Sequence, residues 1–268
     1  MRSVDNWVTP RLTRRARQEK HPVDDFLFEY YPFSAAKLRT WHPGFTNALQ
    51  ADSDDFEEFD PDVYSFDNGT IRLSPSWISQ RTQTIANSLT LLSATHNRPA
   101  KTGCFGLHEW AMVLNQDTIR HSDFQLRLSQ TEIAHTIDEV GLRCTHFDAF
   151  RFFTADARPL NPVQLTRNDQ VAFEQPGCLH ANMDLYKHAM LLAPLVGSEL
   201  VRECFQLAKD IRLVDMQVAP YELSAIGVQP IRVETQTGRQ EYAEKQRSFT
   251  SRAHTLRTSL IAHCEATR

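Results

Sequence analysis

Segments with helical spacing of apolar residues constrain the fold of this 268-residue chain most strongly. In each of them apolar side chains recur every three to four residues, the spacing that places them on one face of an α-helix. The segments are about 76–96, 131–141, 179–193, 199–217 and 238–266. Gly141 and Pro194 mark helix ends, and Ser198 is placed to cap a helix. We therefore expect a mostly helical chain.

A few short strands are expected as well. VYSFDNGTIRL (63–73) predicts a hairpin that turns at Asn68-Gly69, a pair favoured where a tight turn needs positive φ. RCTHFDAFRFFT (143–154) and VQPIRVET (228–235) are rich in aromatic and β-branched residues, which indicates strands. Within residues 21–50, Pro32 separates two short helices. The predicted fold class is mostly α with a few short strands (α+β).

Length and charge indicate how the chain is organised. Residues 1–20 carry six Arg or Lys and predict a basic N-terminal arm or helix. Residues 21–268 are expected to form a single compact, catalytic-type domain with an aromatic-rich helical core and an acidic loop at 51–62.

Composition narrows the possible locations and partners. The net charge of −4 and the pI of about 6.3 do not indicate a protein held on nucleic acid by bulk charge. The longest apolar runs are far shorter than the roughly 18 residues of a membrane span. The N-terminus lacks a secretory signal pattern, and five Cys is an odd number. We expect reduced thiols in a cytoplasmic protein with no membrane partner; the oligomeric state stays open.

Three places share one pattern, a Cys followed closely by a His and then by an acid. They are Cys104/His108/Glu109, Cys144/His146/Asp148 and Cys178/His180/Asp184. In a strand, His146 and Asp148 share a face. Burying such groups without partners costs several kcal/mol. We therefore expect the three clusters to converge on one site. His96, His121, His135, His254 and His263 lie in polar surroundings, and we expect them at the surface.

The three clusters are compatible with three different roles. A His beside a carboxylate forms an acid/base pair. His108, His146 and His180 could instead bind Zn or non-haem Fe, with the nearby acids as further ligands, in an enzyme acting on a small molecule. In a non-catalytic binding module, the same polar groups would only specify packing. Arg151 and Lys187 are candidates for binding an anionic substrate group.

Seven stretches resemble an actinobacterial family commonly labelled 3-methyladenine DNA glycosylase. They are HPVDDFLFEYY (21–31), LRTWHPG (38–44), GCFGLHEWAMV (103–113), RCTHFDAFRFFT (143–154), ARPLN (157–161), EQPGCLHANMDLYK (174–187) and GRQEYAEKQR (238–247). They cover most of the chain outside residues 45–100. The resemblance implies a DNA-repair hydrolase that cleaves the glycosidic bond of an alkylated purine without a cofactor.

Such a base-excision enzyme needs an aromatic pocket for a flipped base and a carboxylate. The resemblance implies catalytic roles among Asp148, Glu109, Asp184 and His146. It implies substrate-binding roles for Arg151, Trp110, Phe147, Tyr186, Lys187 and Asn182. Alkylated DNA would then lie in a basic groove, for which Arg11, Arg14, Arg15 and Arg39 are candidates.

Overall fold

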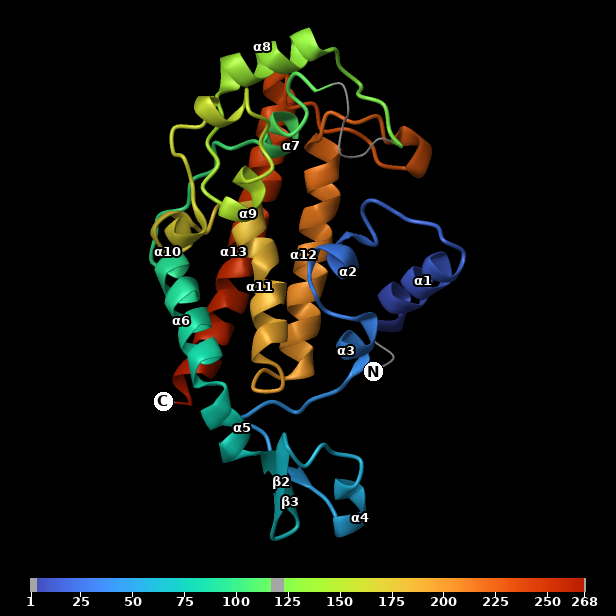
Figure 1. Cartoon of the computed structure of the whole chain (residues 1–268), viewed down its shortest axis with the longest axis vertical. Coiled ribbons are helices and arrows are strands. Elements are labelled where there is room, and N and C mark those ends of the chain that lie inside the picture. The colour runs from blue at the N-terminus through green and yellow to red at the C-terminus, as the bar shows by residue number, and fades with distance from the viewer. Residues whose placement is uncertain (1–3, 117–122, 268) are drawn as a thin grey trace. The chain divides into compact units, whose positions relative to one another are not determined.

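A computed structural model describes residues 4–116 and 123–267 and confirms the fold class (Figure 1). His121 and the first three residues of the basic segment lie outside the described residues. The helices are α1 (Asp5–Ala16), α2 (Phe26–Tyr30), α3 (Ala35–Arg39), α4 (Ser53–Phe56), α5 (Pro75–Gln80), α6 (Thr82–His96), α7 (His108–Ala111), α8 (Gln130–Val140), α9 (Phe147–Phe150), α10 (Gln170–Phe173), α11 (Leu179–Leu192), α12 (Ser198–Val218) and α13 (Gln236–Glu265). The strands are β1 (Leu49–Gln50), β2 (Tyr64–Asp67) and β3 (Thr70–Leu73).

The chain divides into two compact units. The first unit comprises residues 1–93, 184–209 and 255–268, and the second comprises 94–183 and 210–254. The boundary falls within α6, α11, α12 and α13. This division does not test whether residues 21–268 fold as one domain, so the single domain stays a prediction.

The predicted hairpin is confirmed in the first unit. β2 pairs antiparallel with β3 from Tyr64↔Leu73 to Asp67↔Thr70, and β1 adds to the other edge of β3. Asn68 and Gly69 both have positive φ, as the two-residue turn requires. Figure 1 shows α4 beside this hairpin, where the ring of Phe56 stacks on that of Phe66. The predicted acidic loop therefore contains one short helix.

The long helices form where apolar spacing predicts them, with one difference. The segment 76–96 is not a single helix, because Arg81 leaves the helical conformation between α5 and α6. The break coincides with a hydrogen bond from the Arg81 guanidinium to the carbonyl oxygen of Leu191, at 2.8 Å. α2 and α3 are the two short helices expected on either side of Pro32.

The strand predicted at 143–154 is wrong. Residues 142–146 are irregular, and α9 follows at once. A strand needs a neighbour to accept and donate its backbone hydrogen bonds, and none of the described strands lies beside this segment. The amide of Phe150 instead donates to the carbonyl of His146, and the Asn161 side chain bonds both backbone groups of Cys144.

The strand predicted at 228–235 is wrong for the same reason. This segment is irregular, and the amide of Ile231 donates to the carbonyl of Gln217 at the end of α12. Val228, Ile231 and Val233 are nevertheless buried. The apolar residues that indicated a strand thus report burial and not backbone pairing.

His188 on α11 is expected to make the folded state less stable in acid. Burial lowers the pKa of His188 to about 4, beside the Ser88 hydroxyl at 3.2 Å. The unfolded chain has an ordinary pKa of about 6.5. Only the unfolded state takes up this proton between those values, so stability present above pH 6.5 is lost as pH falls toward 4, by about 3 kcal/mol.

Urea unfolding at pH 7.5 and pH 4.5 measures this contribution. His188→Gln should lose less stability than the wild type between the two conditions, because glutamine does not titrate. His135→Gln, at an exposed position of α8, is the control and should behave like the wild type. An equal pH dependence in all three proteins would contradict the assignment.

None of the described helices has the length and apolar character needed to cross a membrane. All five cysteines are free thiols, as expected for reduced cysteines.

Candidate metal centre

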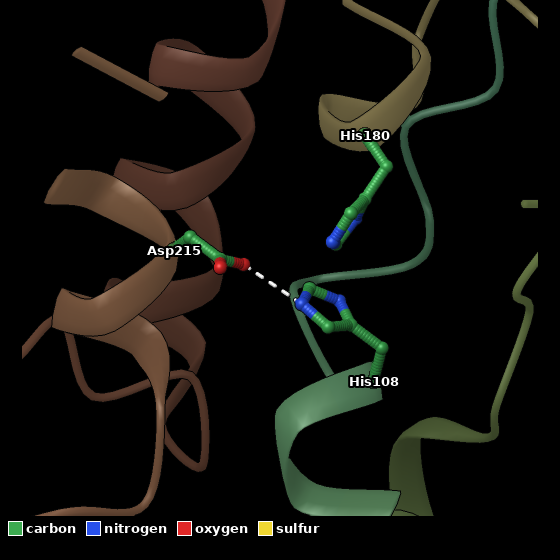
Figure 2. A group of neighbouring side chains, drawn as sticks. All are labelled: His108, His180 and Asp215. Atoms are coloured by element: carbon green, nitrogen blue, oxygen red, sulfur yellow. Dashed lines mark ion pairs between the residues drawn. The ribbon is translucent and has the colours of Figure 1, made fainter. Parts of the chain in front are cut away.

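The side chains of His108, His180 and Asp215 meet in the second unit. His108 begins α7, His180 lies in the first turn of α11, and Asp215 lies near the end of α12. One ligand atom from each residue lies within 4.8 Å of the other two. Figure 2 shows both imidazole rings and the carboxylate facing the same small space. All three residues are buried.

His108 and Asp215 form a buried ion pair, in which His108 Nε2 lies 2.8 Å from Asp215 Oδ1. Two ligands of a tetrahedral ion with bonds of about 2.1 Å lie about 3.4 Å apart. An ion bound by both residues would therefore need these two atoms to move apart by roughly 0.6 Å.

Close packing of α7 against α12 places His108. Gly106 has a φ of +69°, and a Cβ there would lie 2.4 Å from a methyl carbon of Val218. The indole nitrogen of Trp110 donates to the carbonyl of Val218 at 2.8 Å. Because Gly106 has no side chain, α7 can approach the end of α12 and bring His108 to Asp215.

A hydrogen-bonded turn places His180. The side-chain oxygen of Gln175 accepts from the amides of Gly177 and Lys101, and Gln246 donates to the carbonyl of Gly177 at 2.6 Å. A Cβ at Gly177 would lie 2.5 Å from the carbonyl oxygen of Lys101. The turn before α11 is therefore held on both sides, which fixes the first turn of the helix.

Arg212 supplies the buried positive charge of this centre. Its guanidinium lies 2.6 Å from Asp215 Oδ2 and 3.2 Å from Glu109 Oε1, and its exposed fraction is 1%. Since Arg212 holds Oδ2, only Oδ1 of Asp215 is directed toward His108 and His180. The carboxylate is thereby prepared to bind an ion through one oxygen.

Mutual attraction shifts the pKa values of His108 and Asp215 in opposite directions. Burial lowers the pKa of His108, but the charge of Asp215, a hydrogen bond to its carboxylate and the charge of Glu109 together raise it above its ordinary value. Burial raises the pKa of Asp215, but His108, Arg212 and His180 lower it below its ordinary value. A cation entering here would displace a proton from His108, so its affinity should fall as pH decreases.

A small cavity opens beside the two imidazoles. Its volume is about 20 Å³, and its walls include His108, His180, Cys104, Cys144 and Cys178. That is room for about one water molecule. Burial raises the pKa of Cys144 to about 12 and that of Cys178 well above its ordinary value. These thiols are therefore protonated near pH 7 and are not nucleophiles without a further activating group.

The three Cys/His clusters meet, but not all of their acids do. The ring centroids of His108 and His180 are 4.4 Å apart, and those of His146 and His180 are 5.4 Å apart. His146 Nε2 lies 3.5 Å from a carboxylate oxygen of Glu174. His146 is thus next to the centre, but the group that could hold an ion contains Asp215 in its place.

Asp148 is not one of the residues of the His108/His180/Asp215 group. On α9 its carboxylate pairs with Arg151 at 3.2 Å and with Arg167 at 3.3 Å. Arg151 also stacks over the ring of Phe152. An anionic substrate group would therefore compete with Asp148 for the guanidinium of Arg151.

Asp184, Tyr186 and Lys187 belong to the first unit. Asp184 accepts a 2.6 Å hydrogen bond from the Tyr31 hydroxyl and pairs with Lys187 at 3.2 Å. Tyr186 is fully buried and packs edge-on against Tyr31. These contacts are those of a polar group inside a core.

The aromatic residues proposed for stacking do not line the cavity beside His108 and His180. Trp110 is fully buried, and Phe147 lies under the guanidinium of Arg167. Asn182, also buried, donates to the carbonyl of Pro176.

Asp215 and Arg212 were not identified from the sequence. A signal was present, because both occupy buried positions of the amphipathic α12, three residues apart and with opposite charge. An ionisable pair on the apolar face of a helix indicates partners on another element.

No family model, curated protein or solved structure matches this chain. A proposed function therefore depends on the residues themselves.

Proposed function

We propose that this chain is a metal-dependent enzyme acting on a small molecule, with its ion bound by His108, His180 and Asp215. The observation that carries the proposal is the convergence of two buried imidazoles and one buried carboxylate from three different helices, with one ligand atom of each within 4.8 Å of the other two.

The donor set favours Zn²⁺ or Fe²⁺. Two imidazoles with one carboxylate bind catalytic zinc or non-haem iron in proteins. Ca²⁺ and Mg²⁺ prefer sets of oxygen ligands, which two histidines do not supply. Three protein ligands also leave at least one coordination position open, as a catalytic site requires.

The surroundings fit a catalytic role better than a purely structural one. A structural zinc site is closed by four protein ligands, whereas a cavity with room for one water opens beside His108 and His180. The ion would supply a Lewis acid that activates a bound water or polarises a substrate oxygen. The negative charge of Asp215, which Arg212 holds in place, would offset part of the charge of the ion.

Elemental analysis of protein purified without chelators tests the proposal. We expect about one equivalent of zinc or iron per chain, and strong loss of it in His180→Gln. His135→Gln, an exposed histidine on α8, should keep the ion. Less than about a tenth of an equivalent in the wild type, with no uptake of added Zn²⁺ or Fe²⁺, would overturn the proposal.

The glycosylase activity implied by the resemblance stays a prediction. Its basic groove has few available charges, since Arg11 and Arg14 pair with Asp25 and Arg39 pairs with Asp5. The cavity beside His108 and His180 is also too small for a purine without opening. Release of free alkylated base from methylated DNA is the measurement that would establish this activity.

A further inference from the structure

One exposed cationic residue, Arg143, lies on the wall of the cavity beside the candidate metal centre. Its guanidinium has no ion-pair or hydrogen-bond partner among residues 4–116 and 123–267. His108 and His180 also line this cavity. Arg143 therefore adds a positive charge to the wall of this cavity.

Several other arginines of the second unit are held by ion pairs or hydrogen bonds. Arg143 is not, and among the described arginines it is the one that lines this cavity. Arg151 and Arg167 pair with Asp148, and Arg127 pairs with Glu234. Arg98 donates to the carbonyl oxygens of Glu174 and Val171. Each of these guanidinium groups is therefore engaged by the fold, while Arg143 is available to a ligand.

The backbone of Arg143 is fixed although its side chain is exposed. Leu142 before it is buried. The amide of Cys144 after it donates to Asn161 at 2.8 Å, and Asn161 donates back to the Cys144 carbonyl at 3.1 Å. Gly103 leaves room for the guanidinium, since a Cβ there would lie 3.2 Å from Arg143 Nη1. The side chain of Arg143 therefore extends from a loop whose backbone is held by hydrogen bonds.

Arg143 supplies a positive charge at the cavity wall that the fold does not neutralise. The buried carboxylates of Asp215, Glu109 and Glu174 together balance Arg212 and a divalent ion, so the centre itself would be neutral with the ion bound. A planar carboxylate matches the fork of an arginine guanidinium through two parallel hydrogen bonds.

We propose that Arg143 binds the carboxylate of a small organic acid and thereby directs the acid into the cavity toward the ion. The inference depends on the proposed metal centre for the second attachment point, whereas the pairing with Arg143 does not. Because the cavity holds about one water, only a few atoms of the substrate can reach His108 and His180.

Cobalt(II) provides a spectroscopic test. The visible spectrum of the Co²⁺-loaded protein is titrated with acetate, with succinate and with neutral acetamide. We expect the two acids to change the spectrum and acetamide to leave it unchanged. Arg143→Gln should weaken acid binding at least tenfold, and Arg143→Lys should weaken it less. Arg72→Gln, at an exposed arginine of β3 in the first unit, is the matched control and should bind like the wild type.

Cobalt content is measured in every variant, so the two proposals fail separately. Absence of cobalt in the wild type contradicts the metal centre. Calorimetry of the metal-free protein with succinate then tests Arg143 alone, and heat lost in Arg143→Gln but kept in Arg72→Gln supports it. Equal acid binding by both variants, absence of acid binding, or binding of inorganic phosphate in preference to succinate would overturn the inference.

Discussion

Asp215→Asn is expected to lower the affinity for Zn²⁺ or Fe²⁺ by at least about 100-fold, since loss of an outer-shell partner alone typically costs 10–100-fold. The substitution removes the only carboxylate of the three-ligand group. It also removes the negative charge that offsets a divalent ion in a buried site. Competition with a chelator of known affinity measures the change directly.

Asp210→Asn is the matched control for this experiment. Asp210 lies on the same helix, α12, and its carboxylate pairs with Arg252 at 2.7 Å in a partly exposed position. The control should bind metal like the wild type. If both variants kept wild-type affinity while remaining folded, Asp215 would not be a ligand.

Arg212→Met is expected to lower the free energy of unfolding by about 3–5 kcal/mol, the usual cost of removing one member of a buried ion pair. Arg212 lies between Asp215 and Glu109, and all three are buried. Methionine keeps much of the side-chain volume. The decrease in the free energy of unfolding therefore reflects the removal of the positive charge between the two carboxylates. Urea unfolding measures it as a lower midpoint with an unchanged slope.

Two further variants separate charge from packing. Glu109→Gln combined with Arg212→Met should recover part of the loss, because one uncompensated carboxylate is gone. Arg247→Met, at an exposed position of α13, should change stability by no more than about 0.5 kcal/mol. Saturating Zn²⁺ should also stabilise Arg212→Met, since the ion replaces the lost positive charge near Asp215. A loss in Arg212→Met no larger than in Arg247→Met would contradict this account.

The elements that were predicted correctly are those whose conformation depends on residues close together in the sequence. The Asn68-Gly69 hairpin forms because its turn needs positive φ at two successive residues. α8, α11, α12 and α13 form where apolar residues recur with helical spacing, within a few residues of the expected ends. The strand predicted at 143–154 does not form, because a strand requires a neighbouring strand and aromatic content does not provide one.

The candidate site was predicted in part. His108, His146 and His180 were expected near one another because each follows a Cys at the start of an apolar segment, and their rings do lie together. The partnering acid could not be assigned in the same way. Asp148 and Asp184 are closer in sequence to these histidines than Asp215, yet they pair with Arg167 and Tyr31 instead.

The sequence by itself determined the helical class, the hairpin and the three groups of polar residues, since each depends on residues within a few positions of one another. Only the tertiary structure decided that Asp215 meets His108, that Arg212 holds the far oxygen of Asp215, and that Arg143 rather than Arg151 is left for a ligand. The physical reason is that buried charges must find partners. Partners supplied by other helices depend on how those helices pack, as the approach of Gly106 to Val218 illustrates.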